Sequence, residues 1–351
     1  MRKITVSAST KYDVLIGPGL LNAAGELLAP VLTGAEKLAL VADDNTELLY
    51  ADALEQSLAA AGFSVCRFIL PHGEAAKNGA NYLNLLEFFA QEGLTRTDAV
   101  LALGGGVVGD LAGFAAATYL RGVRCVLLPT TLLSMVDSSV GGKCAIDLSA
   151  GKNLAGVFSQ PCAVLADTDC LATLPQEAFS DGCAEILKYA ILGDKPLFET
   201  LLASGRGFDR EAVIAACVAA KASYVAADER DGGLRALLNL GHTVGHAVER
   251  RSGYTVSHGA AVAMGLGVMA RAAAAAGDCS REAADAICAA LGTLGLPWAP
   301  KYPLTELLPP IRADKKRRGE TITLAVIRGI GCCELRELPF AELENYLKAG
   351  F

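Results

Sequence analysis

The chain has 351 residues, of which 52% are hydrophobic and 20% charged, and its formal net charge is −7 at pH 7. This length suggests about two domains, and the composition excludes an intrinsically disordered chain. The acidic balance argues against nucleic acid or an anionic membrane as the main partner, although a basic pocket for a small anion remains compatible with it. The longest uncharged apolar run starts at Gly259 and stops at Arg271, so it is shorter than the ~20 residues that a membrane-spanning helix needs.

The first half of the chain alternates apolar, strand-like runs with helical stretches. A helix is predicted from about residue 80 to 92. Strands are predicted over 37–43, 64–70, 98–106 and 123–129. This alternation is typical of a parallel sheet wrapped by helices. We therefore expect an α/β, Rossmann-like, nucleotide-binding domain over residues 1–174.

From residue 175 the pattern changes to long Ala- and Leu-rich segments with helical spacing. Two short strands, 322–329 and 332–338, are predicted near the end. We expect a mainly α-helical domain over residues 175–351 that binds metal and substrate. The cleft between the two domains is the expected place for an active site.

The N-terminus starts with a short positive segment but lacks the apolar stretch of a secretory signal. Eleven cysteines are present, and they form no CxxC pair. Scattered cysteines without an export signal indicate reduced, mostly buried thiols. These features predict a soluble, cytoplasmic protein.

A glycine-rich turn, Gly104–Asp110, follows a predicted strand and precedes an apolar helix. It satisfies the GxGxxG pattern, which favours a phosphate bound by backbone N–H groups at a helix N-terminus. The acid expected about 20 residues later is missing, because position 124 is Arg, so a nucleotide loop and a purely structural turn fit equally well. Asp43 and Asn45 fit either contact with an adenosine ribose or a helix cap.

A second polar stretch runs from Pro129 to Asn153 and contains Lys143 and Lys152 among glycines and hydroxyl side chains. Lys143 follows two glycines, but the upstream glycine of a P-loop is absent and Cys144 replaces Ser or Thr. The stretch is therefore no Walker A motif. It fits a site for a phosphorylated or carboxylated ligand, or else a solvated loop.

The third pattern is a pair of histidines, His242 and His246, four residues apart on one face of a predicted helix, with His258 opening the next helix. Glu185 lies on an otherwise apolar helix, where a charge is costly unless it is paired or bound to metal. Two or three His with a carboxylate suit a catalytic zinc site, although satisfied core or surface histidines would show the same spacing. Four residues near these groups form either a basic pocket or solvated helix faces: Lys188, Lys221, Arg235 and Asn239.

These residues lie in motifs that resemble the 3-dehydroquinate synthase family of sugar-phosphate cyclases. The run GGGVVGDLAGFAAATYLRGV, the run PTTLLSMVDSSVGGKCAIDLSAGKN, and then LNLGHTVGH, SHGAAVAMG and ADKKRRG follow the family order across nearly the whole chain. The resemblance implies a dehydroquinate synthase-like fold. It also implies conversion of 3-deoxy-D-arabino-heptulosonate 7-phosphate to 3-dehydroquinate and phosphate in the shikimate pathway. NAD and one divalent metal ion, Zn²⁺ or else Co²⁺, are the implied cofactors.

The resemblance also assigns roles to individual residues. The metal ligands would be Glu185, His242 and His258. The catalytic residues would be Asp137, Lys143, Lys188, Lys221 and His246, the last through contact with the substrate phosphate. The substrate, an anionic sugar phosphate, would also contact Arg121, Lys152, Asn153, Arg235, Asn239, Lys315 and Lys316.

The implied NAD site draws on several segments of the first domain. It comprises Asp43, Asn45, His72, Gly73, Glu74, Lys77, Gly105, Gly106, Val107, Val108, Gly109, Asp110, Thr130, Thr131, Lys143, Lys152, Cys170, Leu171, Ala172 and Thr173. In the family the residue corresponding to Arg121 reaches into a neighbouring subunit's site, so the resemblance implies a homodimer. It implies neither a nucleic acid nor a membrane partner.

Three positions depart from the family pattern. His72 stands where an acid often precedes Gly-Glu, and Cys144 replaces the usual Thr. Ala260 stands where the family often has Glu, so we expect a ligand histidine to lack an acidic partner.

Three other functions are alternatives to 3-dehydroquinate synthesis. They are another sugar-phosphate cyclase, such as 2-deoxy-scyllo-inosose synthase or a cyclase of sedoheptulose 7-phosphate, a glycerol-type metal-dependent dehydrogenase, and a non-catalytic protein on the same scaffold.

Overall fold

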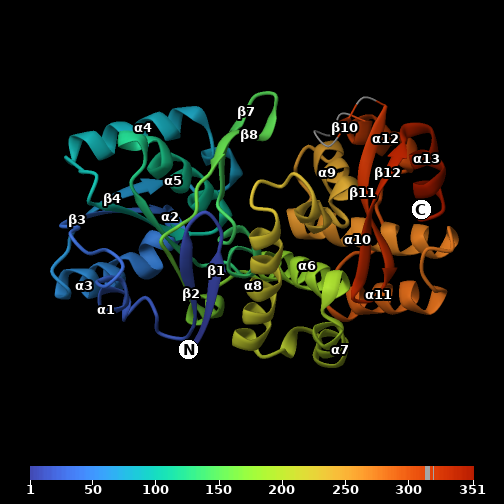
Figure 1. Ribbon diagram of the computed structural model, residues 1–351, viewed down its shortest axis with the longest axis horizontal. Coiled ribbons are helices and arrows are strands. Elements are labelled where there is room, and N and C mark those ends of the chain that lie inside the picture. Colours follow the sequence, from blue (N-terminus) through green and yellow to red (C-terminus); the bar gives the residue numbers. More distant parts are fainter. Residues whose placement is uncertain (313–316, 319) are drawn as a thin grey trace. The chain divides into compact units, whose positions relative to one another are not determined.

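The computed structural model describes residues 1–312, 317–318 and 320–351, which form two compact units (Figure 1). The first unit comprises Met1–Pro175 and Lys221–Arg230. The second comprises Gln176–Ala220 and Asp231–Phe351.

The segment Lys221–Arg230 belongs with the first unit, which a single division after residue 174 does not anticipate. Side-chain contacts explain the grouping. Lys221 Nζ donates to the backbone oxygen of Asp137 at 2.8 Å. Glu229 accepts hydrogen bonds from Ser9 and from Gln160. Polar side chains that lie far apart in the chain make these contacts, so no local pattern in the sequence predicts them.

A seven-stranded sheet of order β1-β2-β9-β6-β5-β3-β4 forms the centre of the first unit. Its strands are β1 (Arg2–Ser7), β2 (Lys11–Gly17), β3 (Lys37–Asp43), β4 (Ser64–Leu70), β5 (Ala99–Gly104), β6 (Arg124–Pro129) and β9 (Ala163–Asp167). Neighbouring strands run parallel except β1 and β2, which form an antiparallel hairpin. The predicted parallel sheet is confirmed for β3 to β6, whereas β1, β2 and β9 are additions to it.

Helices cover the sheet of this unit. All residues of β5 are buried, as are five of the seven in β3, because their side chains are apolar on both faces. Helix α5 packs against β5 and β6. The helices are α1 (Ala24–Leu28), α2 (Asp44–Thr46), α3 (Asp52–Ala60), α4 (Gly79–Gln91) and α5 (Gly106–Thr118). Shorter helical turns are η1 (Glu47–Ala51), η2 (Glu74–Ala76), η3 (Tyr119–Arg121), η4 (Ser134–Ser138) and η5 (Thr168–Ala172).

The glycine- and lysine-rich stretch after Asp137 forms a separate antiparallel hairpin of β7 (Lys143–Leu148) and β8 (Gly151–Phe158). Lys143 pairs with Phe158, and Leu148 pairs with Gly151 across the turn. The interpretation of this stretch as a solvated loop is therefore wrong. Polar residues make the strands hard to recognise, because every residue of β8 is exposed or half-buried, and β7 buries Cys144 and Ile146 alone.

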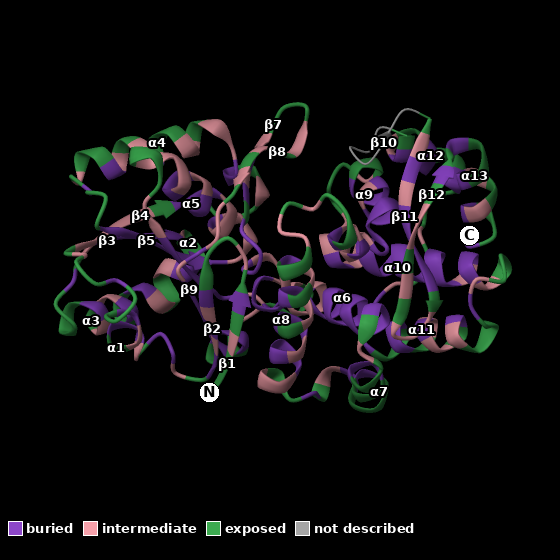
Figure 2. Cartoon of the chain, in the orientation of Figure 1, coloured by how far each residue is buried: buried purple, intermediate pink, exposed green. Residues whose placement is uncertain are grey.

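The second unit is mainly helical, as predicted. Its helices are α6 (Gln176–Gly193), α7 (Lys195–Ser204), η6 (Gly205–Gly207), η7 (Leu234–Asn239), α9 (His242–Arg251), α10 (His258–Ala275), α11 (Arg281–Thr293), α12 (Leu304–Arg312) and α13 (Phe340–Lys348), and α8 (Arg210–Ala227) begins here. The predicted strand pair is confirmed by β11 (Thr321–Gly329) and β12 (Cys332–Pro339), to which β10 (Arg317–Arg318) adds a third strand. Helix α10 is the centre of this unit: it contacts α6, α9 and α11 and is buried along most of its length (Figure 2).

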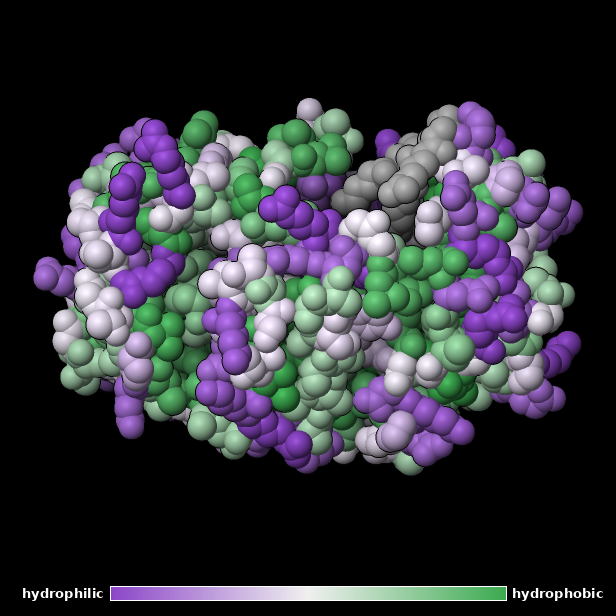
Figure 3. Space-filling model, viewed as in Figure 1, coloured by the Kyte–Doolittle hydropathy of each residue, from purple (hydrophilic) through white to green (hydrophobic). Residues whose placement is uncertain are grey.

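Among the described residues, no helix is both long enough and apolar enough to span a membrane. On the face drawn in Figure 3, hydrophilic residues interrupt the apolar ones. The high mean hydropathy of +0.36 therefore reflects buried segments such as α10 rather than a spanning helix.

Candidate active site

Three side chains of the second unit converge on one point. Glu185 comes from α6, His242 is the first residue of α9, and His258 is the first residue of α10. Glu185 Oε1 lies 3.3 Å from His242 Nε2 and 3.2 Å from His258 Nε2. Zinc bonds of about 2.0–2.2 Å in a tetrahedron place neighbouring donor atoms roughly 3.3–3.5 Å apart. The spacing and the donor types therefore fit a tetrahedral metal site with one position open.

Glycines allow the two histidine-bearing helices to approach each other closely. Gly265 of α10 faces the backbone of Gly241, and an added Cβ would overlap the Gly241 carbonyl oxygen. Gly241 itself has φ of +77°, a left-handed conformation that glycine adopts at little cost. The close approach brings the rings of His242 and His258 to a centroid separation of 5.4 Å. The metal-binding interpretation of the histidine spacing thus has a geometric basis.

The electrostatics of this cluster centre on Glu185, which is fully buried. Burial raises the pKa of its carboxyl, but Lys188 and the two histidines lower that pKa by more, so the carboxylate stays ionised. Lys188 Nζ lies 2.5 Å from Glu185 Oε2. Burial lowers the pKa of His242, whereas the carboxylates of Glu185 and Glu249 outweigh burial and raise the pKa of His258 to about 10. The two carboxylates that contact the His258 ring therefore stabilise a positive charge at this site.

The structure adds one residue that the sequence patterns did not single out. Glu249 of α9 is buried, and its Oε2 lies 3.3 Å from His258 Nδ1. The expectation that His258 lacks an acidic partner because position 260 is Ala is therefore wrong. The sequence does contain a signal for Glu249. This residue follows His246 by three positions and His242 by seven, so all three lie on one helix face. His246, Glu249 and His258 also form a second group with metal-ligand types.

The predicted basic residues of the second unit are buried rather than solvated. Lys188 and Arg235 are each 1% exposed, and Asn239 lies at the end of η7, where its amide donates to the carbonyl of Ala236 at 3.1 Å. The interpretation of these cations as solvated helix faces is wrong, and the same holds for Lys221, which is 6% exposed in the first unit. Buried cations need anionic partners. Lys315 and Lys316 lie outside the described residues.

In the first unit, the glycine-rich turn forms the N-terminus of α5. Gly105 is the N-cap residue, and α5 starts at Gly106. The turn lies beside two residues assigned to the same site: Thr130 N donates to Gly104 O at 3.0 Å, and a Cβ on Gly105 would lie 3.1 Å from Thr131 Cγ2. A helix N-terminus bounded by glycines, with Val107, Val108 and Gly109 in its first turn, leaves backbone N–H groups accessible to an anion.

Asp43 acts as a helix cap. Its Oδ1 accepts from the backbone N of Asn45 at 3.1 Å and of Thr46 at 2.8 Å, at the start of α2. The cap interpretation of Asp43 is confirmed by these bonds, and contact with a ribose stays a prediction.

Other residues assigned to the cofactor lie in this unit as well. His72 is exposed and its Nδ1 lies 2.8 Å from Asp44, and Gly73 has φ of +91°. The Tyr50 hydroxyl contacts Thr173 Oγ1 and donates to the Cys170 carbonyl, which ties helical turn η1 to the segment Cys170, Leu171, Ala172 and Thr173.

Lys77 is the centre of a charge network in the first unit. Its side chain is 5% exposed, and Nζ lies 3.0 Å from Asp110, 3.3 Å from Glu74 and 3.9 Å from Asp147. Lys152 Nζ joins the network 3.6 Å from Glu74. Burial raises the pKa of Asp110 to about 6 even though Lys77 opposes this shift. The network links the loop after β4, the first turn of α5 and the β7–β8 hairpin.

We expect Lys77→Met to destabilise the protein by about 2–3 kcal/mol at pH 8, because three carboxylates would lose the cation that contacts all of them, while Lys152 remains beside Glu74. Their pKa values in the folded state would rise, so the folded state would bind more protons and the loss would be smaller at pH 5. Urea unfolding at the two pH values measures this difference. Lys3→Met, which removes an exposed pair with Asp13, is the control and should cost less than about 0.5 kcal/mol at either pH. An equal loss for Lys77→Met at both pH values would contradict the assigned role of the carboxylates.

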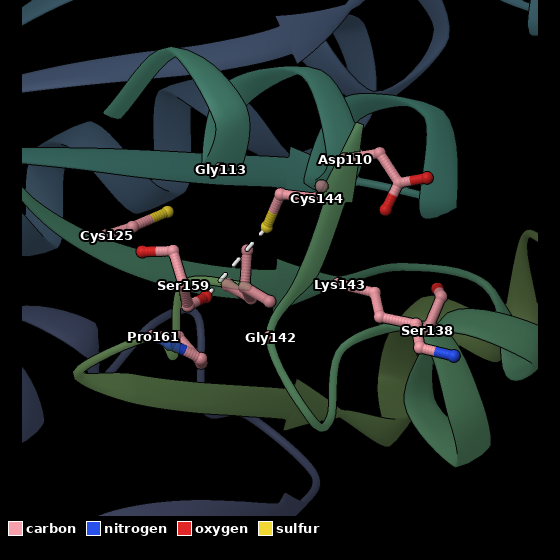
Figure 4. A pocket seen from close by; sticks show the side chains of 11 residues that line it. Asp110, Gly113, Cys125, Ser138, Gly142, Lys143, Cys144, Ser159 and Pro161 are labelled. Atoms are coloured by element: carbon pink, nitrogen blue, oxygen red, sulfur yellow. Dashed lines mark hydrogen bonds between the residues drawn. The ribbon is translucent and has the colours of Figure 1, made fainter. Parts of the chain in front are cut away.

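The hairpin and the turns around it carry the remaining polar residues. Asn153 has φ of +57°, and its backbone N donates to Asp147 Oδ1 at 2.8 Å. Lys221 contacts the carboxylate of Asp137 as well as its backbone oxygen. A pocket of the first unit lies where α5, β6 and the start of β7 meet, and Figure 4 shows Asp110, Ser138 and Lys143 among the residues that line it. Arg121, at the end of η3, is exposed and has φ of +68°.

Comparison with solved structures defines the class of protein. The chain superposes on a 2-deoxy-scyllo-inosose synthase solved with carbaglucose-6-phosphate, NAD⁺ and Co²⁺ with a TM-score of 0.89, at 22% identity and full coverage of both chains. It superposes on ValA, a 2-epi-5-epi-valiolone synthase from Streptomyces hygroscopicus solved with NAD⁺ and Zn²⁺, with a TM-score of 0.88, at 26% identity and coverage of 100% and 99%. The fold is that of the sugar-phosphate cyclases.

Sequence comparison identifies the family within this class. Residues 67–181 match the family described as 3-dehydroquinate synthase N-terminal, and residues 182–317 match 3-dehydroquinate synthase C-terminal. The 3-dehydroquinate synthase of Pelobacter propionicus is 43% identical over 353 residues, which cover 98% of both chains. The chain belongs to the 3-dehydroquinate synthase family. It is an enzyme of the shikimate pathway and a phosphate-eliminating lyase, as the motifs predicted.

Proposed function

We propose that the chain converts 3-deoxy-D-arabino-heptulosonate 7-phosphate to 3-dehydroquinate and phosphate with bound NAD and one divalent metal ion, Zn²⁺ or Co²⁺. The observation that carries the proposal is the convergence of Glu185, His242 and His258 at donor spacings of 3.2–3.3 Å. When bound, the metal supplies Lewis acidity toward a substrate hydroxyl, and NAD supplies a hydride acceptor that is restored within each turnover.

The chain's own residues bind and orient the anionic substrate. Its carboxylate and phosphate are opposite in charge to the buried cations Lys188, Lys221 and Arg235, which we assign to substrate binding. Lys143, Lys152, Asn153 and Asn239 extend the same set, and His246 is assigned to the phosphate. Asp137 pairs with Lys221 and so orients that lysine. This preorganised charge is the protein's main contribution to the elimination of phosphate.

NAD is assigned to the first unit. The glycine-bounded start of α5 suits its pyrophosphate, and we assign Glu74, Lys77 and Asp110 to contact with its sugar hydroxyls. Asp43, Thr130, Thr131 and the segment from Cys170 to Thr173 complete the proposed site. We assign the protein to the cytoplasm and to a homodimer in which Arg121 of each chain contributes to its neighbour's site. Its exposure and position at the end of a short turn support that assignment.

The test is phosphate release from 3-deoxy-D-arabino-heptulosonate 7-phosphate by purified protein with NAD and Zn²⁺, with and without a chelator. We expect release that the chelator abolishes and no net absorbance at 340 nm, because each hydride taken by NAD returns within the cycle. Accumulating NADH would instead indicate a dehydrogenase. Glucose 6-phosphate and sedoheptulose 7-phosphate are the controls for sister cyclases, and release from either, but not from the heptulosonate, would overturn the assigned substrate.

A further inference from the structure

Glu249 lies behind the proposed metal site and has no role in the function described above. It is 5% exposed, and its Oε2 is 3.3 Å from His258 Nδ1, while the opposite nitrogen of the same ring, Nε2, is 3.2 Å from Glu185 Oε1. The imidazole is thus held between two carboxylates, one on each ring nitrogen. Only one of these nitrogens faces the point where Glu185 and His242 converge.

The other histidine of the cluster is held in the same way by a different group. His242 Nε2 faces Glu185 Oε1 at 3.3 Å, and its Nδ1 lies 3.1 Å from the carbonyl oxygen of Leu240. Both rings therefore direct Nε2 at Glu185 and Nδ1 at an acceptor. An imidazole that binds a metal through one nitrogen carries its proton on the other, and an acceptor there fixes the tautomer and the ring orientation.

We infer that Glu249 is a positioning residue for the metal site: it accepts the Nδ1–H of His258 and so presents the Nε2 lone pair of that ligand to the metal. This inference rests on the metal site proposed above. The start of α10 is fixed independently, because Ser257 Oγ donates to Asp181 Oδ1 at 2.6 Å and Gly259 packs directly on the backbone of Asp181. The backbone at His258 is therefore set by α6, and what remains to be set is the rotation of the ring, which Glu249 controls.

The same residues permit one competing arrangement. His246, Glu249 and His258 also offer donor atoms within 4.8 Å of one another, with Glu249 as a direct ligand. The two arrangements differ in which second histidine is needed: His242 in the first and His246 in the second. This difference makes the inference testable by metal binding alone, without recourse to turnover.

The experiment measures Zn²⁺ affinity by competition with a chromophoric chelator and records the visible spectrum of the Co²⁺-substituted protein. The variants are Glu249→Ala, Glu249→Gln and His246→Ala. Glu306→Gln is the matched control. It removes an exposed acid of α12 that pairs with Arg251, and Arg251 lies on α9, the helix that also carries Glu249. Thermal unfolding of each metal-free variant identifies any that fails to fold.

We expect Glu249→Ala to weaken Zn²⁺ binding by about 10–100-fold, the usual cost of losing such a partner, and to shift the Co²⁺ bands. Glu249→Gln should recover much of this loss, because the amide oxygen still accepts the Nδ1–H, and it carries the test if the alanine variant does not fold. Glu306→Gln and His246→Ala should bind Zn²⁺ like the parent protein.

Two results would overturn the inference. The first leaves the proposed function standing, and the second also overturns the assignment of Glu185 and His242 as metal ligands. Parent-like affinity and Co²⁺ spectra in both Glu249 variants would show that the acid does not position His258. Loss of Zn²⁺ binding in both His246→Ala and the Glu249 variants would place the metal in the competing group, with Glu249 as a ligand. Failure of the parent protein to bind one metal ion per chain would instead overturn the proposed function itself.

Discussion

Glu185→Gln will abolish stoichiometric metal binding and lower phosphate release by at least about 1000-fold, the equivalent of roughly 4 kcal/mol of lost catalysis. The substitution keeps the size of the side chain but removes the one carboxylate that contacts both histidines. It also removes the carboxylate that pairs with Lys188, which is 1% exposed. Both effects act at the same point, so the loss should be larger than for any single pocket lysine.

The measurements are metal content after dialysis against trace Zn²⁺ and phosphate release under saturating NAD. Glu177→Gln is the control, because it makes the same change on an exposed position in the first turn of the same helix, α6. It should leave both quantities unchanged. A Glu185→Gln protein that retains one metal ion per chain and full turnover would show that the metal does not bind at the assigned triad.

The sequence anticipates this cluster because its histidines fall at positions with strong local signals, and the family resemblance adds the assignment of Glu185, His242 and His258 as metal ligands. His242 and His246 are spaced for one helix face, and His258 opens a helix whose apolar run stays uninterrupted to Arg271. Strands β3 to β6 are likewise visible as apolar runs, because a strand buried on both faces carries apolar residues at every position. Periodicity and burial therefore account for the correct part of the prediction.

Contacts between segments that are distant in the chain could not be predicted from the sequence. Glu249 contacts His258 across a helix connection, and Lys77 meets Asp147 through folding of the β7–β8 hairpin. Strand β8 of the hairpin has no buried residue and lacks the apolar alternation of a covered strand, so its residues resemble a loop. In each case a polar side chain acquires its role from a tertiary neighbour, and no local period encodes that neighbour.

Gly265→Ala will destabilise the protein by about 2–4 kcal/mol and weaken metal binding at the same time. Alanine gains up to about 1 kcal/mol of helix propensity over glycine, but here the added methyl would overlap the carbonyl oxygen of Gly241. Backbone atoms cannot turn away as a flexible side chain can, so α9 and α10 must separate. Since His242 follows Gly241 directly and His258 lies on α10, the separation would widen the spacing of the two histidine ligands.

Gly292→Ala on α11 provides the matched control, because no atom lies within 4 Å of a Cβ built there. That variant should be as stable as the parent protein or more stable by up to about 1 kcal/mol. Thermal unfolding without metal isolates the packing effect, and Zn²⁺ competition then reports the ligand spacing. If Gly265→Ala unfolds like Gly292→Ala and binds Zn²⁺ like the parent protein, the close approach of α9 and α10 is not what sets the histidine geometry. A loss confined to Zn²⁺ affinity would mean that the helices separate without unfolding, which still assigns the spacing to this glycine.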